Sequence, residues 1–202
     1  MDFTNINGLE PVQKALSSRE MQAVTDPRYR PSAVLLLLYP KDGEYCVMFN
    51  KRSEEVEFNK GDMCFPGGGK DPEDTDLVAT AVRETHEEMG IRPQDVTILG
   101  ELDDTVTMSG FFIHPFVGTI PYPYQFKPST IEVAEVVEIP VSALLDVRNL
   151  REEARVLPNG HLTANRSYAY GRHLIYGATA RILGQFLDIV QQAGWPGGAP
   201  SR

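Results

Sequence analysis

The sequence is poor in cysteine, with only Cys46 and Cys64 among its 202 residues. Neither residue belongs to a CxxC pair or to a Cys/His cluster, which excludes a disulfide framework and a thiolate zinc site. Two reduced, partly buried thiols are typical of a protein from a reducing compartment. We therefore expect a cytoplasmic location.

A long hydrophobic run is also lacking. The longest is AVLLLLY at 33–39, far short of the roughly 20 apolar residues that a transmembrane helix needs. The first seven residues are polar and contain no apolar stretch of the kind found in a signal peptide. The run at 33–39 instead predicts a buried strand.

Positive charge is scarce, because 19 lysines and arginines face 28 acidic residues and give a net charge of −9 and a pI near 4.9. This balance argues against non-specific binding to nucleic acid or to an anionic membrane, so neither partner is expected. If the substrate is itself a phosphate ester, two anions must meet. A bridging cation would neutralise them.

Strand and helix patterns alternate along the chain, which indicates an α/β layered domain. We predict helices at 9–25, 76–89, 141–145 and 174–192, and strands at 32–39, 44–50, 96–102, 113–120, 133–139, 151–157 and 166–170. Residues 51–74 are predicted to form a long, functional loop. No linker divides the chain, so residues 1–192 are predicted to be one domain, with 1–31 as an N-terminal extension. The Gly/Pro-rich segment 193–202 is predicted to be a disordered tail.

The segment RETHEEMG places three carboxylates, Glu84, Glu87 and Glu88, on one short helix. On a helical wheel they lie beside the apolar stripe, where partial burial favours recruitment of a cation such as Mg²⁺ or Mn²⁺. Most ExxEE segments are simply solvated helix faces. Here the context is more specific, because a glycine-rich loop precedes the helix and Gly90 ends it. The bare backbone of such a loop can approach a phosphate closely.

This segment resembles the signature of the Nudix hydrolases, G-x5-E-x7-R-E-U-x-E-E-x-G-U, in which U is apolar. Residues 83–91 match its second half except for Thr85 at the first U. In the first half, counting back from Arg83 puts Gly69 in the glycine position and Thr75 in the glutamate position. If the loop contains one extra residue, Gly68 takes the glycine position and Asp74 the glutamate position. We favour this second register because it keeps an acid in the glutamate position. A helix N-cap role for Asp74 is compatible with both registers.

A second resemblance concerns Nudix enzymes that cleave coenzyme A, whose motif is L-L-T-x-R-S/A-x3-R-x3-G-x3-F-P-G-G. Residues 48–53 (MFNKRS), Gly61 and 65–68 (FPGG) follow this motif at the same spacing. The segments 108–118, 131–140 and 175–183 are also similar to that branch. Glu57 stands where the motif has arginine. This charge reversal keeps an ADP-ribose or nucleotide-sugar pyrophosphatase open as the alternative.

The resemblance implies a Nudix-type α/β/α sandwich with a mixed central sheet and a loop–helix–loop catalytic motif. It also implies Mg²⁺- or Mn²⁺-dependent hydrolysis of a nucleoside diphosphate linked to another group. The first candidate is the pyrophosphate of coenzyme A or its derivatives, giving 3′,5′-ADP and 4′-phosphopantetheine. The catalytic candidates are Arg83, Glu84, Glu87, Glu88 and Glu132. Among them, Glu84, Glu87 and Glu88 are the metal-ligand candidates. The substrate-binding candidates are Arg52, Gly67, Gly68, Gly69 and Lys70.

Several interpretations remain open beside this one. Glu87 could be a ligand or the general base, and Glu135 is a second base candidate outside the motif. Tyr122, Tyr124 and Phe126 could stack on an adenine, or pack on the core. A non-catalytic nucleotide-binding module of the same fold and an acidic Ca²⁺-binding domain are rivals, although the second lacks an EF-hand-like loop. A homodimer is compatible by fold analogy alone.

Overall fold

A mixed eight-stranded sheet forms the centre of the protein in the computed structural model, which describes residues 8–156 and 162–195. Along its main path the strand order is β3-β2-β1-β7-β5, with β4 also paired to β1, β6 to β7 and β8 to β2. The strands are β1 (Arg30–Lys41), β2 (Glu44–Arg52), β3 (Met63–Cys64), β4 (Gly67–Gly69), β5 (Thr97–Glu101), β6 (Thr105–Val106), β7 (Phe111–Thr119) and β8 (Val133–Pro140). β1 and β7 run parallel, whereas β1 pairs with β2 and β4 in antiparallel fashion. The predicted mixed sheet is confirmed.

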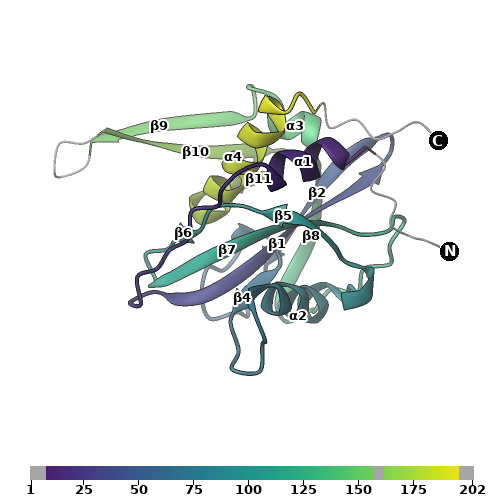
Figure 1. Cartoon of the computed structure of the whole chain (residues 1–202), viewed down its shortest axis with the longest axis vertical. Coiled ribbons are helices and arrows are strands. Elements are labelled where there is room, and N and C mark those ends of the chain that lie inside the picture. Colours follow the sequence, from purple (N-terminus) through teal and green to yellow (C-terminus); the bar gives the residue numbers. More distant parts are fainter. Residues whose placement is uncertain (1–7, 157–161, 196–202) are drawn as a thin grey trace.

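Helices cover both faces of this sheet (Figure 1). Helix α2 (Leu77–Met89) packs on one face against β1 and β4. The other face carries α1 (Glu10–Ser17), α3 (Val141–Leu145) and α4 (Gly177–Gln192), and a short 3-10 turn, η1 (Pro93–Asp95), follows α2. The predicted α/β/α layering is therefore confirmed.

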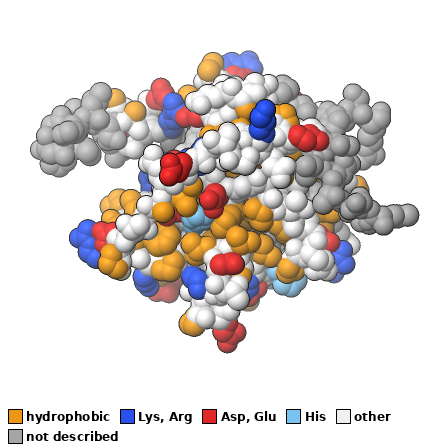
Figure 2. All heavy atoms as spheres, in the orientation of Figure 1, with side chains coloured by type: hydrophobic (Ala, Val, Ile, Leu, Met, Phe, Trp, Pro, Cys, Tyr) orange, Lys and Arg blue, Asp and Glu red, His pale blue; other side chains and the backbone are white. Residues whose placement is uncertain are grey.

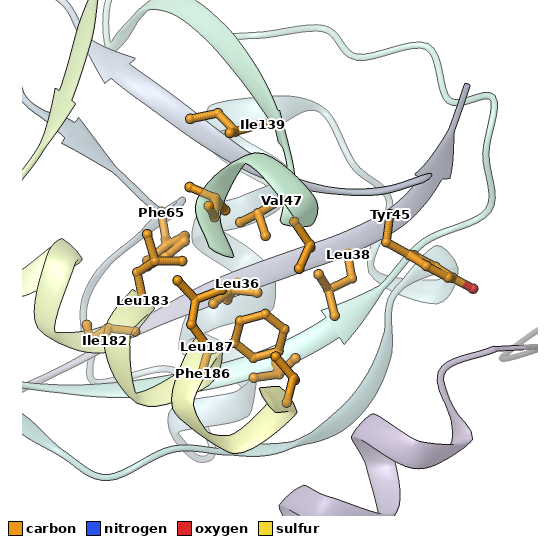
Figure 3. Close-up of a cluster of buried hydrophobic side chains, with 14 of the residues drawn as sticks. Leu36, Leu38, Tyr45, Val47, Phe65, Ile139, Ile182, Leu183, Phe186 and Leu187 are labelled. Carbon is orange, nitrogen blue, oxygen red and sulfur yellow. The ribbon is translucent and has the colours of Figure 1, made fainter. Parts of the chain in front are cut away.

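The apolar run of β1 is explained by burial on both of its faces. Leu35 and Leu37 belong to the core cluster on the α2 side, whereas Leu36 and Leu38 belong to the cluster under α4. Figure 3 shows Leu36 and Leu38 facing Leu183, Phe186 and Leu187 of α4. A strand that is buried on both sides has no polar alternation, which is why this segment is continuously hydrophobic.

A smaller three-stranded sheet of β9 (Leu150–Val156), β10 (Leu162–Tyr170) and β11 (His173–Ile175) follows α3. Its β9–β10 ribbon reaches out beyond the main body in Figure 1. The predicted helix at 174–192 therefore starts too early. The backbone of Leu174 pairs with Ala169 in the ribbon, and α4 begins only at Gly177.

The predicted helix at 9–25 is too long, because α1 ends at Ser17. Beyond it, the backbone N–H groups of Gln22 and Val24 donate to the carboxylates of Asp103 (3.0 Å) and Asp104 (2.7 Å). These side chains replace the helical carbonyls as acceptors and hold the segment extended along the sheet.

The predicted disordered tail, 193–202, includes three residues that the structure describes as packed, 193–195. The side chain of Trp195 is buried against Tyr45, with ring centroids 5.3 Å apart, and its indole N–H donates to the carbonyl of Gly8 at 2.7 Å. Aromatic burial thus keeps 193–195 within the packed structure, and that part of the prediction is wrong. Residues 196–202 lie outside the described residues.

The surface in Figure 2 shows a group of hydrophobic side chains between the upper helices and α2. A hollow of about 360 Å³, lined by Leu16, Met21, Val78, Ile98 and Phe116 among others, lies between α1, α2 and the β5–β7 edge. Within 8–156 and 162–195, no helix has the length and hydropathy needed to cross a bilayer.

Candidate active site

Helix α2 carries the acidic motif and has a defined start and end. The side chain of Asp76 caps its first turn by accepting the N–H of Ala79 at 2.7 Å. Gly90 ends it in the left-handed conformation, with φ of 67°, as predicted. The N-cap is thus Asp76, and the alternative that Asp74 caps the helix is wrong.

Asp74 is instead the partner of Arg83. The Nε and Nη2 atoms of Arg83 donate to the two carboxylate oxygens of Asp74, each at 2.9 Å, and Thr80 donates a further hydrogen bond at 2.9 Å. The Arg83 guanidinium holds the pKa of Asp74 well below its ordinary value, and the pKa of Arg83 is raised in return. Thr75 is exposed. This geometry favours the register with Gly68 and Asp74.

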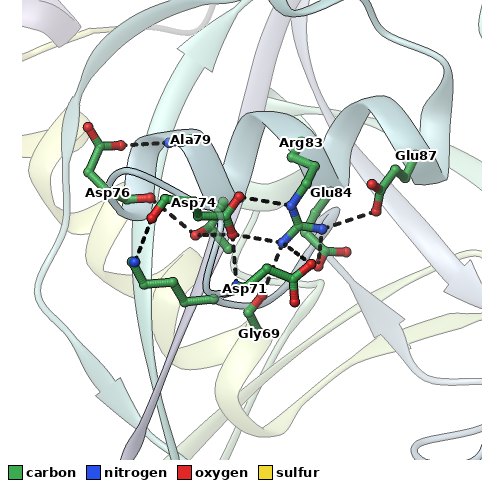
Figure 4. A network of polar contacts seen from close by, with 10 residues as sticks. Gly69, Asp71, Asp74, Asp76, Ala79, Arg83, Glu84 and Glu87 are labelled. Carbon is green, nitrogen blue, oxygen red and sulfur yellow. Dashed lines mark hydrogen bonds and ion pairs between the residues drawn. The ribbon is translucent and has the colours of Figure 1, made fainter.

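Arg83 also organises the glycine loop and two of the three motif glutamates (Figure 4). Its Nη1 atom donates to Glu84 at 3.0 Å and to Glu87 at 3.1 Å, and its Nη2 atom donates to the carbonyl of Gly69 at 3.2 Å. Glu87 is about half exposed, whereas Glu84 is mostly covered. One arginine therefore joins the loop to the acidic face of α2.

Glu88 is the most deeply buried of the three glutamates. It is 5% exposed, and its Oε2 accepts hydrogen bonds from the side-chain amide of Asn50 at 2.8 Å and from the N–H of Gly67 at 3.3 Å. Burial, together with the neighbouring charges of Glu84 and Glu132, raises the pKa of Glu88 to about 8. Burial also raises the pKa of Glu84, against the opposing effect of Arg83. Burial and the mutual repulsion of these acids therefore both disfavour their ionised forms in the protein alone.

The glycine loop comes close to these carboxylates because its side chains are absent. Gly67–Gly69 form β4, which pairs with residues 32–34 of β1. A methyl group at Gly68 would lie 2.4 Å from Oε1 of Glu84, so only glycine leaves this carboxylate its space. Gly67, with φ of 153°, lies directly against the β1 backbone.

Arg52 and Lys70, the two cationic candidates, have different surroundings. Arg52, at the end of β2, donates through Nε to the carbonyl of Phe58 at 3.2 Å, and its charge helps to lower the pKa of Glu88. Lys70 donates through Nζ to the carbonyl of Asp74 at 2.7 Å. Arg52 thus lies near the Glu88 carboxylate, whereas Lys70 stabilises the loop between β4 and α2 through the Asp74 carbonyl.

The two base candidates also differ. Glu132 is exposed and close enough for its charge to contribute to the raised pKa of both Glu84 and Glu88. Glu135 is paired with Arg172 at 2.8 Å, and this contact lowers its pKa. The pairing with Arg172 therefore counts against Glu135 and leaves Glu132 as the favoured base candidate.

Other candidate residues serve the core. Tyr122 stacks on Tyr39 with ring centroids 5.2 Å apart, and the Tyr124 hydroxyl donates to Asp95 at 2.8 Å, which supports the packing alternative over adenine stacking.

Two neighbours of the site were not predicted as site residues from the sequence, Asn50 and Cys64. Burial, together with the charge of Glu88, raises the pKa of the Cys64 thiol to about 12. The sequence does contain a signal for Asn50, because an asparagine that follows the apolar run of a buried strand is unusual and suggests a specific role.

The residues present fit a hard divalent cation. The donors are carboxylate oxygens, the pKa of buried Glu88 is raised, and Oδ1 of buried Asn50 has no hydrogen-bond partner among the described residues. No three His, Cys, Asp or Glu side chains are placed to hold a metal by themselves, as far as the described ranges show. Such an arrangement suits Mg²⁺, which usually keeps water and substrate oxygens among its ligands.

Comparison with known proteins agrees with this geometry. Residues 28–139 match the NUDIX domain model. The chain is 34% identical over 162 residues to an uncharacterized Nudix hydrolase, NudL, of Photorhabdus laumondii, covering 80% of this chain and 86% of that protein. It is 37% identical over 113 residues to the mouse peroxisomal coenzyme A diphosphatase NUDT7, covering 56% of this chain and 48% of the mouse protein, about half its length.

The fold is also found in a MutT/nudix family protein from Enterococcus faecalis, with a TM-score of 0.56 over 87% of this chain and 66% of that one. Its sequence is only 12% identical, so this likeness concerns the fold alone. Three findings agree. The structure has an acidic helix organised by Arg83 beside a glycine loop, residues 28–139 match the family model, and the chain is related to NudL. The chain belongs to the Nudix hydrolase family.

Proposed function

We propose that this Nudix hydrolase cleaves the pyrophosphate of coenzyme A or its derivatives, with Mg²⁺ or Mn²⁺, to give 3′,5′-ADP and 4′-phosphopantetheine. One observation carries the substrate assignment. The segment that resembles the coenzyme A motif runs from the end of β2 through β3 to β4 and brings Arg52 and Gly67 beside Glu88. This closeness supports the proposal that the motif segment and the acidic helix act as one site.

In this proposal Glu84, Glu87 and Glu88 hold the cation, and Arg83 keeps their carboxylates in place through its bonds to Glu84 and Glu87. The bound cation supplies neutralisation of the pyrophosphate charge and acidification of a water molecule. Mg²⁺ and Mn²⁺ are the expected ions because every proposed protein ligand is a carboxylate oxygen.

The remaining groups bind substrate and move a proton. Arg52 and the bare backbone of Gly67–Gly69 bind the phosphate oxygens, and Lys70 keeps the loop in position from the carbonyl of Asp74. Glu132 takes the proton of the attacking water, whose oxygen forms a bond to one phosphorus as the bridging P–O bond breaks. The leaving phosphate departs as an anion.

The test is hydrolysis of coenzyme A and of ADP-ribose, side by side, with Mg²⁺, with Mn²⁺ and with EDTA, using Glu88→Gln as the control. Metal-dependent release of 3′,5′-ADP that the substitution abolishes supports the proposal. Cleavage of ADP-ribose alone overturns the substrate and keeps the metal site. Turnover of neither favours the nucleotide-binding module.

Glu57 gives this test a second arm. It is exposed and stands where the coenzyme A motif has arginine, so its charge opposes an anionic substrate. We expect Glu57→Arg to lower the KM for coenzyme A. An unchanged KM would place Glu57 outside the binding surface.

A further inference from the structure

Asn50 is a buried polar residue on an otherwise apolar strand face. Its side chain is 1% exposed, and the neighbouring residues on the same face of β2, Cys46 and Met48, belong to the core cluster on the α2 side. Its Nδ2 donates to Oε2 of Glu88 at 2.8 Å. Its Oδ1 is fully buried and has no hydrogen-bond partner among the described residues.

Stability alone does not explain this residue. A buried acceptor without a partner costs about 1–3 kcal/mol, whereas an apolar side chain would have continued the packing of Met48. Buried polar groups that lack a partner therefore call for a functional explanation. Within residues 8–156 and 162–195, the one hydrogen bond of the Asn50 amide to another side chain goes to Glu88.

The hydrogen bond fixes one specific oxygen of Glu88. Asn50 and the N–H of Gly67 both donate to Oε2, so Oε1 is left without a share in these two bonds. A carboxylate held in this way presents one oxygen to a cation at a defined angle, and such supporting donors tune metal affinity.

We propose that Asn50 is a positioning residue that holds Glu88 for the divalent cation. This inference rests on the metal-binding part of the proposed function and is independent of the substrate. Asn50 acts through its side-chain N–H, which donates to Glu88. An apolar side chain would avoid the energetic cost of the unpartnered Oδ1, but it could not donate this hydrogen bond. The motif that this segment resembles has threonine at the same position, and a threonine hydroxyl can also donate.

The test is Mn²⁺ binding by the protein without substrate, measured by calorimetry or by the EPR signal of free Mn²⁺. Threonine and valine have nearly the same shape and differ in the hydroxyl, so Asn50→Thr and Asn50→Val form a matched pair. We expect Asn50→Val to raise the Kd for Mn²⁺ about 10- to 100-fold and Asn50→Thr to retain most of the affinity. Equal Kd values for the two variants would overturn the inference.

A double-mutant cycle tests whether Asn50 acts through Glu88. In a Glu88→Ala background, Asn50→Val is expected to cause no further change in Kd. A full additional loss would show that Asn50 acts by another route and would overturn the inference. If Asn50→Val does not fold, Asn50→Ser and Asn50→Ala form the second matched pair, with the same expected order.

Two further controls separate the possible failures. Met48→Ala is expected to lower the melting temperature in EDTA and leave the Kd unchanged, because Met48 packs on the same face without bonding Glu88. An equal rise in Kd for this variant would assign the Asn50 effect to packing. Absence of Mn²⁺ binding by the unmodified protein would overturn both this inference and the metal site of the proposed function.

Discussion

Gly68 and Glu84 occupy adjoining space, because a methyl group at Gly68 would lie 2.4 Å from Oε1 and 2.7 Å from Oε2 of the glutamate. The contact joins the glycine loop to the acidic helix, which are separated in sequence. It also means that the loop fixes the space in which the Glu84 carboxylate can lie. A glycine at position 68 is therefore required for the observed position of the Glu84 carboxylate.

Gly68→Ala is predicted to weaken cation binding with little loss of stability. The added methyl displaces the far end of a flexible side chain, so the fold adapts while Glu84 moves. We expect the Kd for Mn²⁺ to rise about tenfold or more, measured by calorimetry beside a urea unfolding curve. A large loss of unfolding free energy with unchanged Kd would contradict this prediction.

The neighbouring glycines provide contrasting controls. A methyl at Gly67 would lie 2.3 Å from the carbonyl oxygen of Ala33, a backbone atom that cannot move aside, so Gly67→Ala should cost about 3 kcal/mol or more. At Gly69 the nearest atom is Cε1 of Phe111 at 3.9 Å, an ordinary contact. Gly69→Ala should stay within about 0.5 kcal/mol. The same unfolding measurement ranks all three.

Asp74→Asn is predicted to lower the unfolding free energy by about 1–3 kcal/mol, because it weakens the two-point bond to Arg83 within a mostly buried site. Activity should fall as well, since Arg83 also holds Glu84 and Glu87. Asp71→Asn is the control, as Asp71 is 63% exposed and lies 3.7 Å from Arg83. Equal losses for both variants in urea unfolding would argue against a special role for Asp74.

The metal-free protein is predicted to lose stability as the pH rises from about 5 to about 8. The pKa of Glu88 is about 8 in the folded protein against an ordinary value of 4.5, so the folded state binds this proton more tightly. Above pH 8 the full cost of the buried charge applies, on the order of a few kcal/mol.

Urea unfolding in EDTA at several pH values checks this prediction. Glu88→Gln should remove most of the slope and leave a smaller contribution from Glu84, whose pKa is also raised. Added Mn²⁺ should stabilise the unmodified protein more at pH 8 than at pH 6, because the cation binds the ionised carboxylates. An unchanged slope in Glu88→Gln would assign the effect to another group.

Glu132→Gln is predicted to reduce kcat about 10²- to 10⁴-fold, the range expected for a lost general base. Glu135→Gln should leave kcat nearly unchanged, since Glu135 is already paired with Arg172. Steady-state kinetics at saturating Mn²⁺ compare the two variants. The reverse ranking would move the base from Glu132 to Glu135.

Sequence patterns predicted the layers of this fold and the acidic helix, because the relevant signals are local. Asp76 and Gly90 mark the ends of α2 within the chain itself, and the run at 33–39 identifies a doubly buried strand. The start of α4 and the end of α1 were misplaced because distant partners decide them. Leu174 pairs with Ala169, and Asp103 and Asp104 capture the segment after Ser17.

The candidate site was likewise predictable where the signal is local, and not where distant residues meet. The spacing of Arg83 and the three glutamates could be read directly, and so could a choice of register. The Asn50–Glu88 bond joins residues 38 positions apart, and no local pattern specifies that pairing. The different surroundings of Glu132 and Glu135 likewise depend on Arg172, which a folded ribbon brings to the second acid.

The bond between Trp195 and Gly8 has a practical consequence for producing this protein. The recognisable family region covers 28–139, yet α4 supplies one side of the core and Trp195 closes it over Tyr45. A chain trimmed to the family region would expose the hydrophobic face beneath α4 to water and would be expected to aggregate. During synthesis this face likewise stays open until α4 has left the ribosome and can pack on it.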